Sequence, residues 1–169
     1  LPFKEEESKI VIIPVPWELT TSYGKGTHLG PKSIFEASFQ LDLYQQYFPD
    51  FWKCGIFIQK ENEKLRKRGL ELENSAKELS EFFNNSTKLT ESDLRKLDEI
   101  NTACLEMNTY VYQQSRKIIE QESIPIVLGG DHSTPLGLIK ALSEEHRNFG
   151  ILHIDAHADL RRAYQGFKF

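Results

Sequence analysis

The stretch "IPIVLGGDHS", from Ile124 to Ser133, begins as an apolar run and ends with two glycines, an acid and a histidine before its last serine. Its apolar part does not alternate with polar residues, a pattern typical of a parallel strand that is covered on both faces. The glycines allow the backbone to bend sharply where the strand ends. Ligands bind at the carboxyl ends of strands in open α/β sheets, so we expect Asp131 and His132 to lie at a binding edge. Taken alone, these two residues also fit a structural hydrogen-bonded pair.

Three other runs share this unalternated apolar character. They are "KIVIIPVP" (Lys9 to Pro16), "CGIFI" (Cys54 to Ile58) and "FGILHIDA" (Phe149 to Ala156). The prolines of the first run are expected to end it, because proline has no backbone N–H to pair with a neighbour. We predict that all four runs are adjacent parallel strands of one sheet, with helices on both faces.

Apolar residues at helical spacing lie between these runs and predict amphipathic crossover helices. One set is Leu72, Ala76, Leu79 and Phe83, and the other is Leu97, Ile100, Cys104, Met107, Val111 and Ile118. Thr90 and Asp93 are spaced as a capping box that starts the second helix. A shorter helix is expected after Ser133 or Thr134 as its cap, with Pro135 in the first helical position. The residues expected to face inward from it are Leu138, Ile139 and Leu142.

The alternation of strands and helices predicts a single α/β domain over residues 1–169. The chain is 39% hydrophobic and 27% charged, which suits a globular domain with one core. We expect the charged stretch from Lys60 to Arg68 to be solvated surface or loop. Cys54 and Cys104 have no metal or redox spacing and are expected to be reduced residues of the core.

Net charge and hydropathy exclude several kinds of partner. The formal net charge is −4, and Lys and Arg are mixed with Glu, so we expect no surface for nucleic acid. The longest apolar runs, such as Ile10 to Ile13 and Ile124 to Leu128, are far shorter than the ~20 residues of a membrane helix. No signal-peptide pattern is present. We therefore expect a cytoplasmic protein with neither a nucleic-acid nor a membrane partner.

The segment "GILHIDAHADL", Gly150 to Leu160, carries the strongest chemical signal. In an extended chain alternate side chains share a face, so Asp155, His157 and Asp159 converge beyond the end of the predicted strand. Two carboxylates and an imidazole held together repel and desolvate one another unless a cation lies between them. This donor set suits Mn, Zn, Fe or Co. The alternative is a carboxylate pair that forms a turn and a helix cap.

Two other histidines have a structural and a functional interpretation. His153 shares the face of Asp155, but its place inside an apolar run favours a buried core histidine over a metal ligand. His28 lies in the glycine-rich stretch "YGKGTHLGP" (Tyr23 to Pro31). A histidine of a surface loop is favoured there over a residue that lines the entrance of a substrate pocket. That stretch is not a phosphate-binding loop, because it lacks the Lys-Ser or Lys-Thr pair.

"GGDHS" (Gly129 to Ser133) followed by "HIDAHADLR" (His153 to Arg161) resembles the ureohydrolases, the arginase and agmatinase family. The fuller tail "DAHADLRRAYQG" (Asp155 to Gly166) is most similar to agmatinase-type members. A looser similarity lies in "PVPWELTTSYGKGTHLGPKSIFEAS" (Pro14 to Ser38), which resembles the opening strand, glycine-rich loop and Gly-Pro helix start of the family. The resemblance therefore touches both ends of the chain.

The resemblance implies an arginase-like three-layer α/β/α fold with two Mn²⁺ ions at the carboxyl ends of the strands. Carried over by position, His132 binds one ion together with Asp159, Asp155 bridges both ions, and His157 binds the second. Asp131 then orients His132 or its loop. The implied reaction converts a small guanidino substrate, agmatine or a relative, to urea and an amine, as in polyamine metabolism. The family also implies a homo-oligomer in the full-length protein.

The sequence departs from the family pattern in one respect. Family members supply two further Asp ligands from a later strand and a nearby proton-transferring His, and no equivalent is present by Phe169. We therefore expect an amino-terminal piece of a longer enzyme, itself inactive, whose final aromatic run "YQGFKF" (Tyr164 to Phe169) has nothing to bury it. Two alternatives stay open: a related metal hydrolase that acts on an amide or formimino group, and a chain without catalysis.

Overall fold

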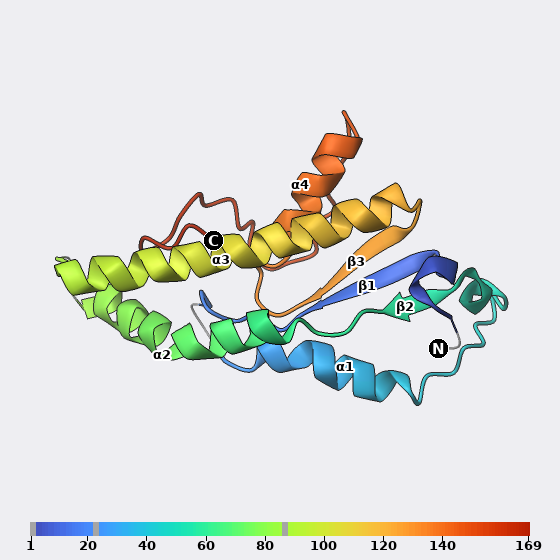
Figure 1. Cartoon of the computed structure of the whole chain (residues 1–169), viewed down its shortest axis with the longest axis horizontal. Helices are drawn as coiled ribbons and strands as arrows, with labels where there is room; N and C mark the ends of the chain where they lie inside the picture. Colours follow the sequence, from blue (N-terminus) through green and yellow to red (C-terminus); the bar gives the residue numbers. More distant parts are fainter. Residues whose placement is uncertain (1–2, 22–23, 86–87) are drawn as a thin grey trace.

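A computed structural model describes residues 3–21, 24–85 and 88–169 (Figure 1). The strands are β1 (Ile10–Val15), β2 (Ile56–Ile58) and β3 (Ile124–Gly129). The α-helices are α1 (Gly30–Ser38), α2 (Glu63–Asn85), α3 (Glu91–Glu120) and α4 (Leu136–Glu145). Short 3₁₀ turns lie at Glu5–Glu7, Thr27–Leu29 and Phe51–Cys54. No helix in the described parts of the chain is long and apolar enough to cross a membrane.

The three strands form one parallel sheet in the order β2-β1-β3. Ile10 at the start of β1 is in register with Ile56 on one side and with Ile124 on the other. The first three predicted strands and their parallel pairing are therefore confirmed. In Figure 1 the long helix α3 and the short helix α1 lie on opposite sides of the strands, so the fold is the predicted mixed α/β arrangement.

The fourth predicted strand is wrong, because residues 149–156 have no regular secondary structure. Apolar side chains of this segment are exposed, with Leu152 at 87% and Ile154 at 89% of full exposure. No described segment pairs with its backbone, and a strand without a paired neighbour has no ladder hydrogen bonds to hold it extended. The apolar pattern predicted a strand covered on both faces, and the described residues supply neither the pairing nor the cover.

The core lies between β1 and the helices α2 and α3. Val11 and Ile13 are fully buried on the face of β1 that meets these helices. The helical residues buried with them are Leu72, Ala76, Leu79, Ile100, Cys104, Met107, Val111 and Ile118. Both long helices and their predicted inward faces are thus confirmed. Burial raises the pKa of the Cys104 thiol to about 12, so it stays protonated as a core residue, whereas Cys54 is only half-buried.

The prediction that helices cover both faces of every strand fails at β3. Ile124 is 52% exposed and Ile126 is 41% exposed, on the face opposite the core. The helix α1 reaches this strand only near its end, where Gly30 lies against the backbone carbonyl of Gly129. One face of the sheet is therefore packed, and the other is partly open.

Helix starts were predicted with mixed success. Thr90 caps α3 as predicted: its hydroxyl accepts a hydrogen bond from the Asp93 N–H at 3.2 Å, and the Asp93 carboxylate accepts one from the Thr90 N–H at 3.0 Å. Helix α4 instead begins at Leu136, after Pro135, and no side chain caps it. The hydroxyls of Ser133 and Thr134 bond to Asp131, so the predicted cap is wrong.

The charged stretch from Lys60 to Arg68 was expected to be solvated surface or loop. From Glu63 onward it forms the first turns of α2 on the surface, so the surface interpretation holds and the loop interpretation does not.

The carboxyl-terminal aromatic run packs against the helices, contrary to prediction. Phe167 is only 6% exposed, and its ring meets the ring of Phe83 edge-on with centroids 6.1 Å apart. The Asn101 amide of α3 donates to the carbonyl of Gly166 at 3.1 Å and accepts from the N–H of Lys168 at 2.8 Å. The two long helices therefore bury Phe167 of this run, whereas Tyr164 stays 49% exposed.

Candidate metal centre

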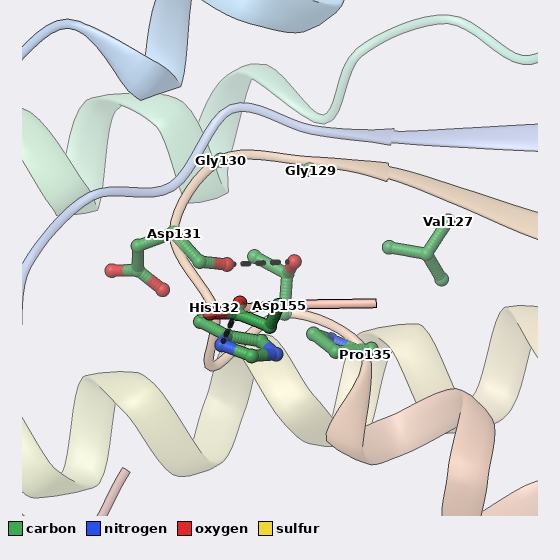
Figure 2. Close-up of a pocket in the computed structure, with 8 residues that line it drawn as sticks. Val127, Gly129, Gly130, Asp131, His132, Pro135 and Asp155 are labelled. Carbon is green, nitrogen blue, oxygen red and sulfur yellow. Dashed lines mark hydrogen bonds and ion pairs between the residues drawn. The ribbon is translucent and has the colours of Figure 1, made fainter. Parts of the chain in front are cut away.

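The loop after β3 is held by the buried side chain of Asp131. Its carboxylate accepts hydrogen bonds from the N–H of Leu19 at 3.1 Å and from the N–H and hydroxyl of Ser133 at 3.0 and 2.5 Å. Its own N–H donates to the carbonyl of Trp17 at 2.8 Å. The side chain of Asp131 therefore ties the loop after β3 to the loop after β1. This fixes the backbone from which His132 projects (Figure 2).

The two glycines before Asp131 are required by close packing within the protein. A Cβ atom on Gly130 would lie 2.0 Å from the carbonyl oxygen of Trp17. A Cβ atom on Gly129 would lie 2.2 Å from the hydroxyl oxygen of Thr134. At Gly130 any side chain would collide with the backbone of Trp17, so this glycine allows the two loops to meet, whereas Gly129 leaves room for the Thr134 side chain.

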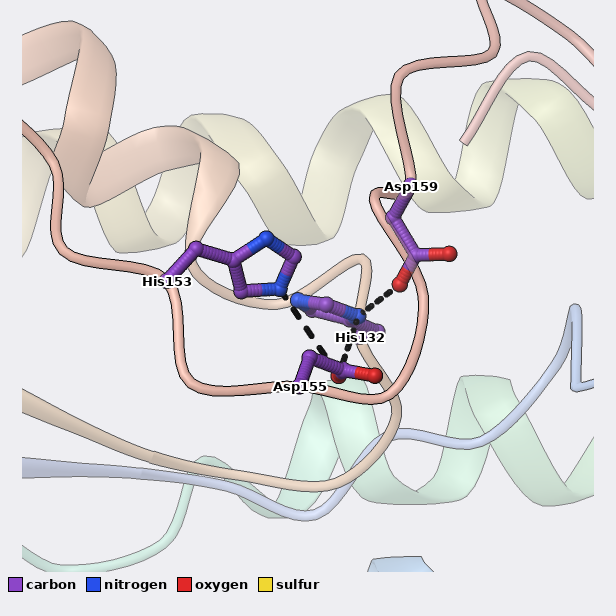
Figure 3. Close-up of side chains that lie close together, drawn as sticks. All are labelled: His132, His153, Asp155 and Asp159. Atoms are coloured by element: carbon purple, nitrogen blue, oxygen red, sulfur yellow. Dashed lines mark ion pairs between the residues drawn. The ribbon is translucent and has the colours of Figure 1, made fainter.

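Four side chains converge beside this loop: His132, His153, Asp155 and Asp159 (Figure 3). One ligand atom from each lies within 4.8 Å of the other three. His132 Nδ1 is 3.5 Å from Asp155 Oδ2 and is also paired with Asp159 Oδ2. His153 Nε2 is 3.7 Å from the same Asp155 oxygen. Imidazole nitrogens and carboxylate oxygens together are donors that suit a divalent transition metal, so the residues present fit such an ion.

His157, also predicted as a ligand, lies outside this cluster. Its side chain is 82% exposed, and its Nδ1 is 3.8 Å from the other oxygen of Asp155, Oδ1. The two oxygens of Asp155 thus face different histidines. The backbone N–H of His157 also donates to Oδ1 at 3.0 Å and is the largest cause that lowers the pKa of Asp155, with the nearby imidazoles adding to it.

His153 is not the buried core histidine that its sequence position favoured. It is exposed, and its ring lies 5.1 Å from the ring of His132, centroid to centroid. The favoured interpretation rested on the expected strand, which the segment does not form. The alternation of side chains along an extended chain placed His153 on the same face as Asp155. That pattern was the sequence signal for its place in the cluster with His132, Asp155 and Asp159.

Glu18 is a structural residue of the site that sequence reasoning missed. Its side chain is 3% exposed, and both of its oxygens accept from the N–H of Gly26 at 2.9 Å. It also accepts from the N–H of His28 at 3.0 Å and lies 2.8 Å from His28 Nδ1. Burial by itself raises the pKa of Glu18, but the hydrogen bonds from His28 and Gly26, with Lys25, outweigh burial and hold it below its ordinary value.

Glu18 therefore anchors the glycine-rich loop to the end of β1. The next residue, Leu19, is bonded to Asp131, so this loop is linked through two buried carboxylates to the loop of His132. His28 lies in the short turn Thr27–Leu29 of this loop and is half-buried against Glu18. A buried acid followed by a glycine-rich stretch is a common pattern, and no sequence spacing singles out Glu18 as this anchor.

An open cleft of about 340 Å³ borders the cluster, and its walls include Val127, Asp131, His132 and Asp155 (Figure 2). An adjoining cleft brings Thr20, Thr21 and Arg161 beside His132 and Asp159. Arg161 stacks over the ring of Tyr164, with its guanidinium carbon 4.7 Å from the ring centroid. The cluster therefore lies where a small molecule has access from solvent.

A parallel sheet in a mixed α/β fold, with His and Asp side chains gathered beyond its carboxyl edge, defines the class: an α/β protein with a candidate metal centre. Within that class the chain belongs to the arginase family, whose sequence profile matches residues 8–169. It is 30% identical over 161 residues to a protein from Bacillus cereus named agmatinase, covering 95% of this chain and 44% of the relative. It is 26% identical to a protein from Synechocystis named N(1)-aminopropylagmatine ureohydrolase, with 95% and 43% covered.

A solved structure supports the same fold. The crystal structure of agmatine ureohydrolase of Thermoplasma volcanium matches 99% of this chain and 45% of its own chain, with a TM-score of 0.62 at 20% identity. The chain thus spans less than half the length of these relatives.

Proposed function

We propose that the protein carrying this chain is a binuclear manganese hydrolase that cleaves a guanidinium group, of agmatine or a similar compound, to urea and an amine. The observation that supports this most is the convergence of His132, Asp155 and Asp159 at the edge where β3 ends. The named activities of its relatives in the arginase family, agmatinase and aminopropylagmatine ureohydrolase, support the substrate class.

In this proposal each residue has a separate task. His132 and Asp159 would hold one ion, His157 would hold the second, and Asp155, whose two oxygens face different histidines, would contribute to both. When bound, the two ions lower the pKa of a shared water so that it supplies a nucleophile at neutral pH. Asp131 keeps the His132 loop in place through its bonds to Leu19 and Ser133, and the cleft admits the guanidinium beside these donors.

The test compares Asp155→Asn with His157→Asn in the purified protein loaded with Mn²⁺. Asn is neutral and has one acceptor oxygen, so Asp155→Asn is expected to lose both ions and all urea release from agmatine. His157→Asn is expected to lose one ion. Asp42→Asn changes an exposed acid that bonds only locally to the N–H of Tyr44, and it serves as the matched control.

The measurements are metal content by mass spectrometry and urea release, with arginine, guanidinobutyrate and simple amides as further substrates. Retention of both ions and activity by Asp155→Asn would contradict the assigned roles. Turnover of amides but not of guanidino compounds would instead identify a related amide hydrolase.

A further inference from the structure

We propose that the segment from Phe39 to Trp52, here called the aromatic segment, is a docking surface that binds a second copy of this chain across a two-fold axis. The inference goes beyond the proposed function, because the cluster of His and Asp side chains and the clefts beside it include no residue of this segment. In Figure 1 the segment leads from the end of α1 around one end of the molecule to β2, away from residues 149–169 on the side of α3 and α4.

Large exposed apolar side chains are concentrated in the aromatic segment. Six of them are between 56% and 78% exposed: Phe39, Leu41, Tyr44, Tyr47, Phe48 and Phe51. At roughly 200 Å² for each fully exposed side chain of this size, together they offer on the order of 800 Å². The largest apolar patch on a typical monomer is about 300–600 Å². A standard protein–protein interface takes about 800 Å² from each partner, so the aromatic segment exposes the area that a stable dimer buries.

The backbone of the aromatic segment is held by successive turns. The N–H of Phe48 donates to the carbonyl of Gln45 at 3.1 Å, and the N–H of Phe51 donates to the carbonyl of Phe48 at 3.1 Å. The N–H of Lys53 then donates to the carbonyl of Asp50 at 3.0 Å. The exposed rings therefore project from a backbone that its own hydrogen bonds already order, so less conformational entropy is lost when a partner binds.

The two edges of the sheet differ in the cover they need. β2, which follows the aromatic segment, has three residues, and a very short strand is typical of a protected sheet edge. At the other edge, residues 149–156 and the outer side of β3 lack a paired neighbour within the described parts of the chain. Further strands of the same polypeptide would satisfy those backbone groups. The aromatic segment instead needs cover for its side chains alone, which the surface of a second molecule supplies.

The charges of the aromatic segment are few and already paired. It contains no Lys or Arg, and its two acids are Asp42 and Asp50. Asp50 pairs with Lys53 at 2.8 Å, and Asp42 accepts a hydrogen bond from the N–H of Tyr44 at 2.9 Å. Anionic lipids and nucleic acids bind basic surfaces, so neither fits this segment. An aromatic surface without free charge is complementary to itself, and a two-fold axis places it against the same surface of a second copy.

The experiment measures the mass of the purified protein carrying this chain by sedimentation velocity over a range of concentrations. The double variant Tyr47→Glu/Phe48→Glu places two charges on each side of the proposed interface. It is expected to raise the dissociation constant of the two-fold contact at least about a hundredfold, and so to halve the mass of the assembly. The matched control, Leu94→Glu/Leu105→Glu, changes two exposed leucines of α3 and is expected to leave the mass unchanged. Circular dichroism checks that both variants keep their fold.

Hydroxyl-radical footprinting of the unmodified protein gives a second readout that depends on no variant. Oxidation of Tyr47 and Phe48 is expected to fall as the concentration rises and the protein assembles, while oxidation of Leu105 stays constant. Protection of the two rings in protein that sediments as a single copy would show that another segment of the same polypeptide covers them. That result, exposure of the rings at every concentration, or an unchanged mass of the double variant would overturn the inference. Metal content and urea release test the proposed function separately from all of these results.

Discussion

A single buried carboxylate, Glu18, determines how the glycine-rich loop is held. We expect Glu18→Gln to lower the free energy of unfolding at pH 7 by about 1.5–3 kcal/mol, because it replaces charge-assisted hydrogen bonds to Gly26 and His28 with weaker ones. Glu36→Gln is the control, since Glu36 has a 64% exposed side chain and is expected to change stability by less than about 0.5 kcal/mol. Urea unfolding followed by circular dichroism measures both variants.

The pH dependence gives this prediction a second check. The pKa of Glu18 is lower in the folded chain than its unfolded value of about 4.3, so its ionised form stabilises the fold above that pH. This stabilisation is lost as the pH falls through the folded pKa. The stability difference between the unmodified protein and Glu18→Gln is therefore expected to shrink as the pH falls below about 4.3, the unfolded pKa, toward the lower pKa of the folded chain. A difference that stays constant over this range would show that Glu18 acts by shape and not by charge.

The sequence singled out some residues of the candidate site and missed others, for identifiable reasons. His132, Asp155 and Asp159 were found because acids and imidazoles at strand ends form a recognisable pattern, and the structure brings all three together. Glu18 was missed because its role depends on N–H groups from a loop ten residues away, which no spacing rule encodes. His153 was assigned to the core because it lies in an apolar run, and that interpretation depended on a strand that does not form.

At the scale of elements, α3 shows how a local signal sets a boundary. Thr90→Ala is expected to destabilise the protein by about 1 kcal/mol, because the N–H of Asp93 loses the cap that Thr90 provides. Thr109→Ala, on an exposed face inside the same helix, is expected to be neutral or to stabilise by a few tenths of a kcal/mol, since alanine has the higher helix propensity. Opposite signs in thermal melts would identify the cap, and equal effects would contradict it.

Elements with local signals and a packed face were predicted correctly, whereas those that depend on absent neighbours were not. The helices α2 and α3 carry their apolar faces at helical spacing, and β1 lies between two paired strands. The run from Phe149 to Ala156 shares with β1 an apolar pattern that does not alternate with polar residues, but this pattern indicates only a need for cover. Strand structure also requires a paired backbone, which the described residues do not supply to this run. The start of α4 was misplaced because Ser133 and Thr134 bond back to Asp131 and not forward to the helix.

The whole molecule has a one-sided core, and this uneven packing predicts how stability is distributed. Ile13 of β1 is fully buried against the long helices, whereas Ile154 is 89% exposed. Ile13→Ala is expected to lower the free energy of unfolding by about 2–5 kcal/mol, through lost burial and the cavity it leaves. Ile154→Ala is expected to change it by less than about 0.5 kcal/mol, because no packing is lost. Urea unfolding at several protein concentrations measures both variants. A cost for Ile154→Ala comparable to that of Ile13→Ala would show that residues 149–156 are packed in solution, and a cost that grows with concentration would show that a second copy of the chain covers them.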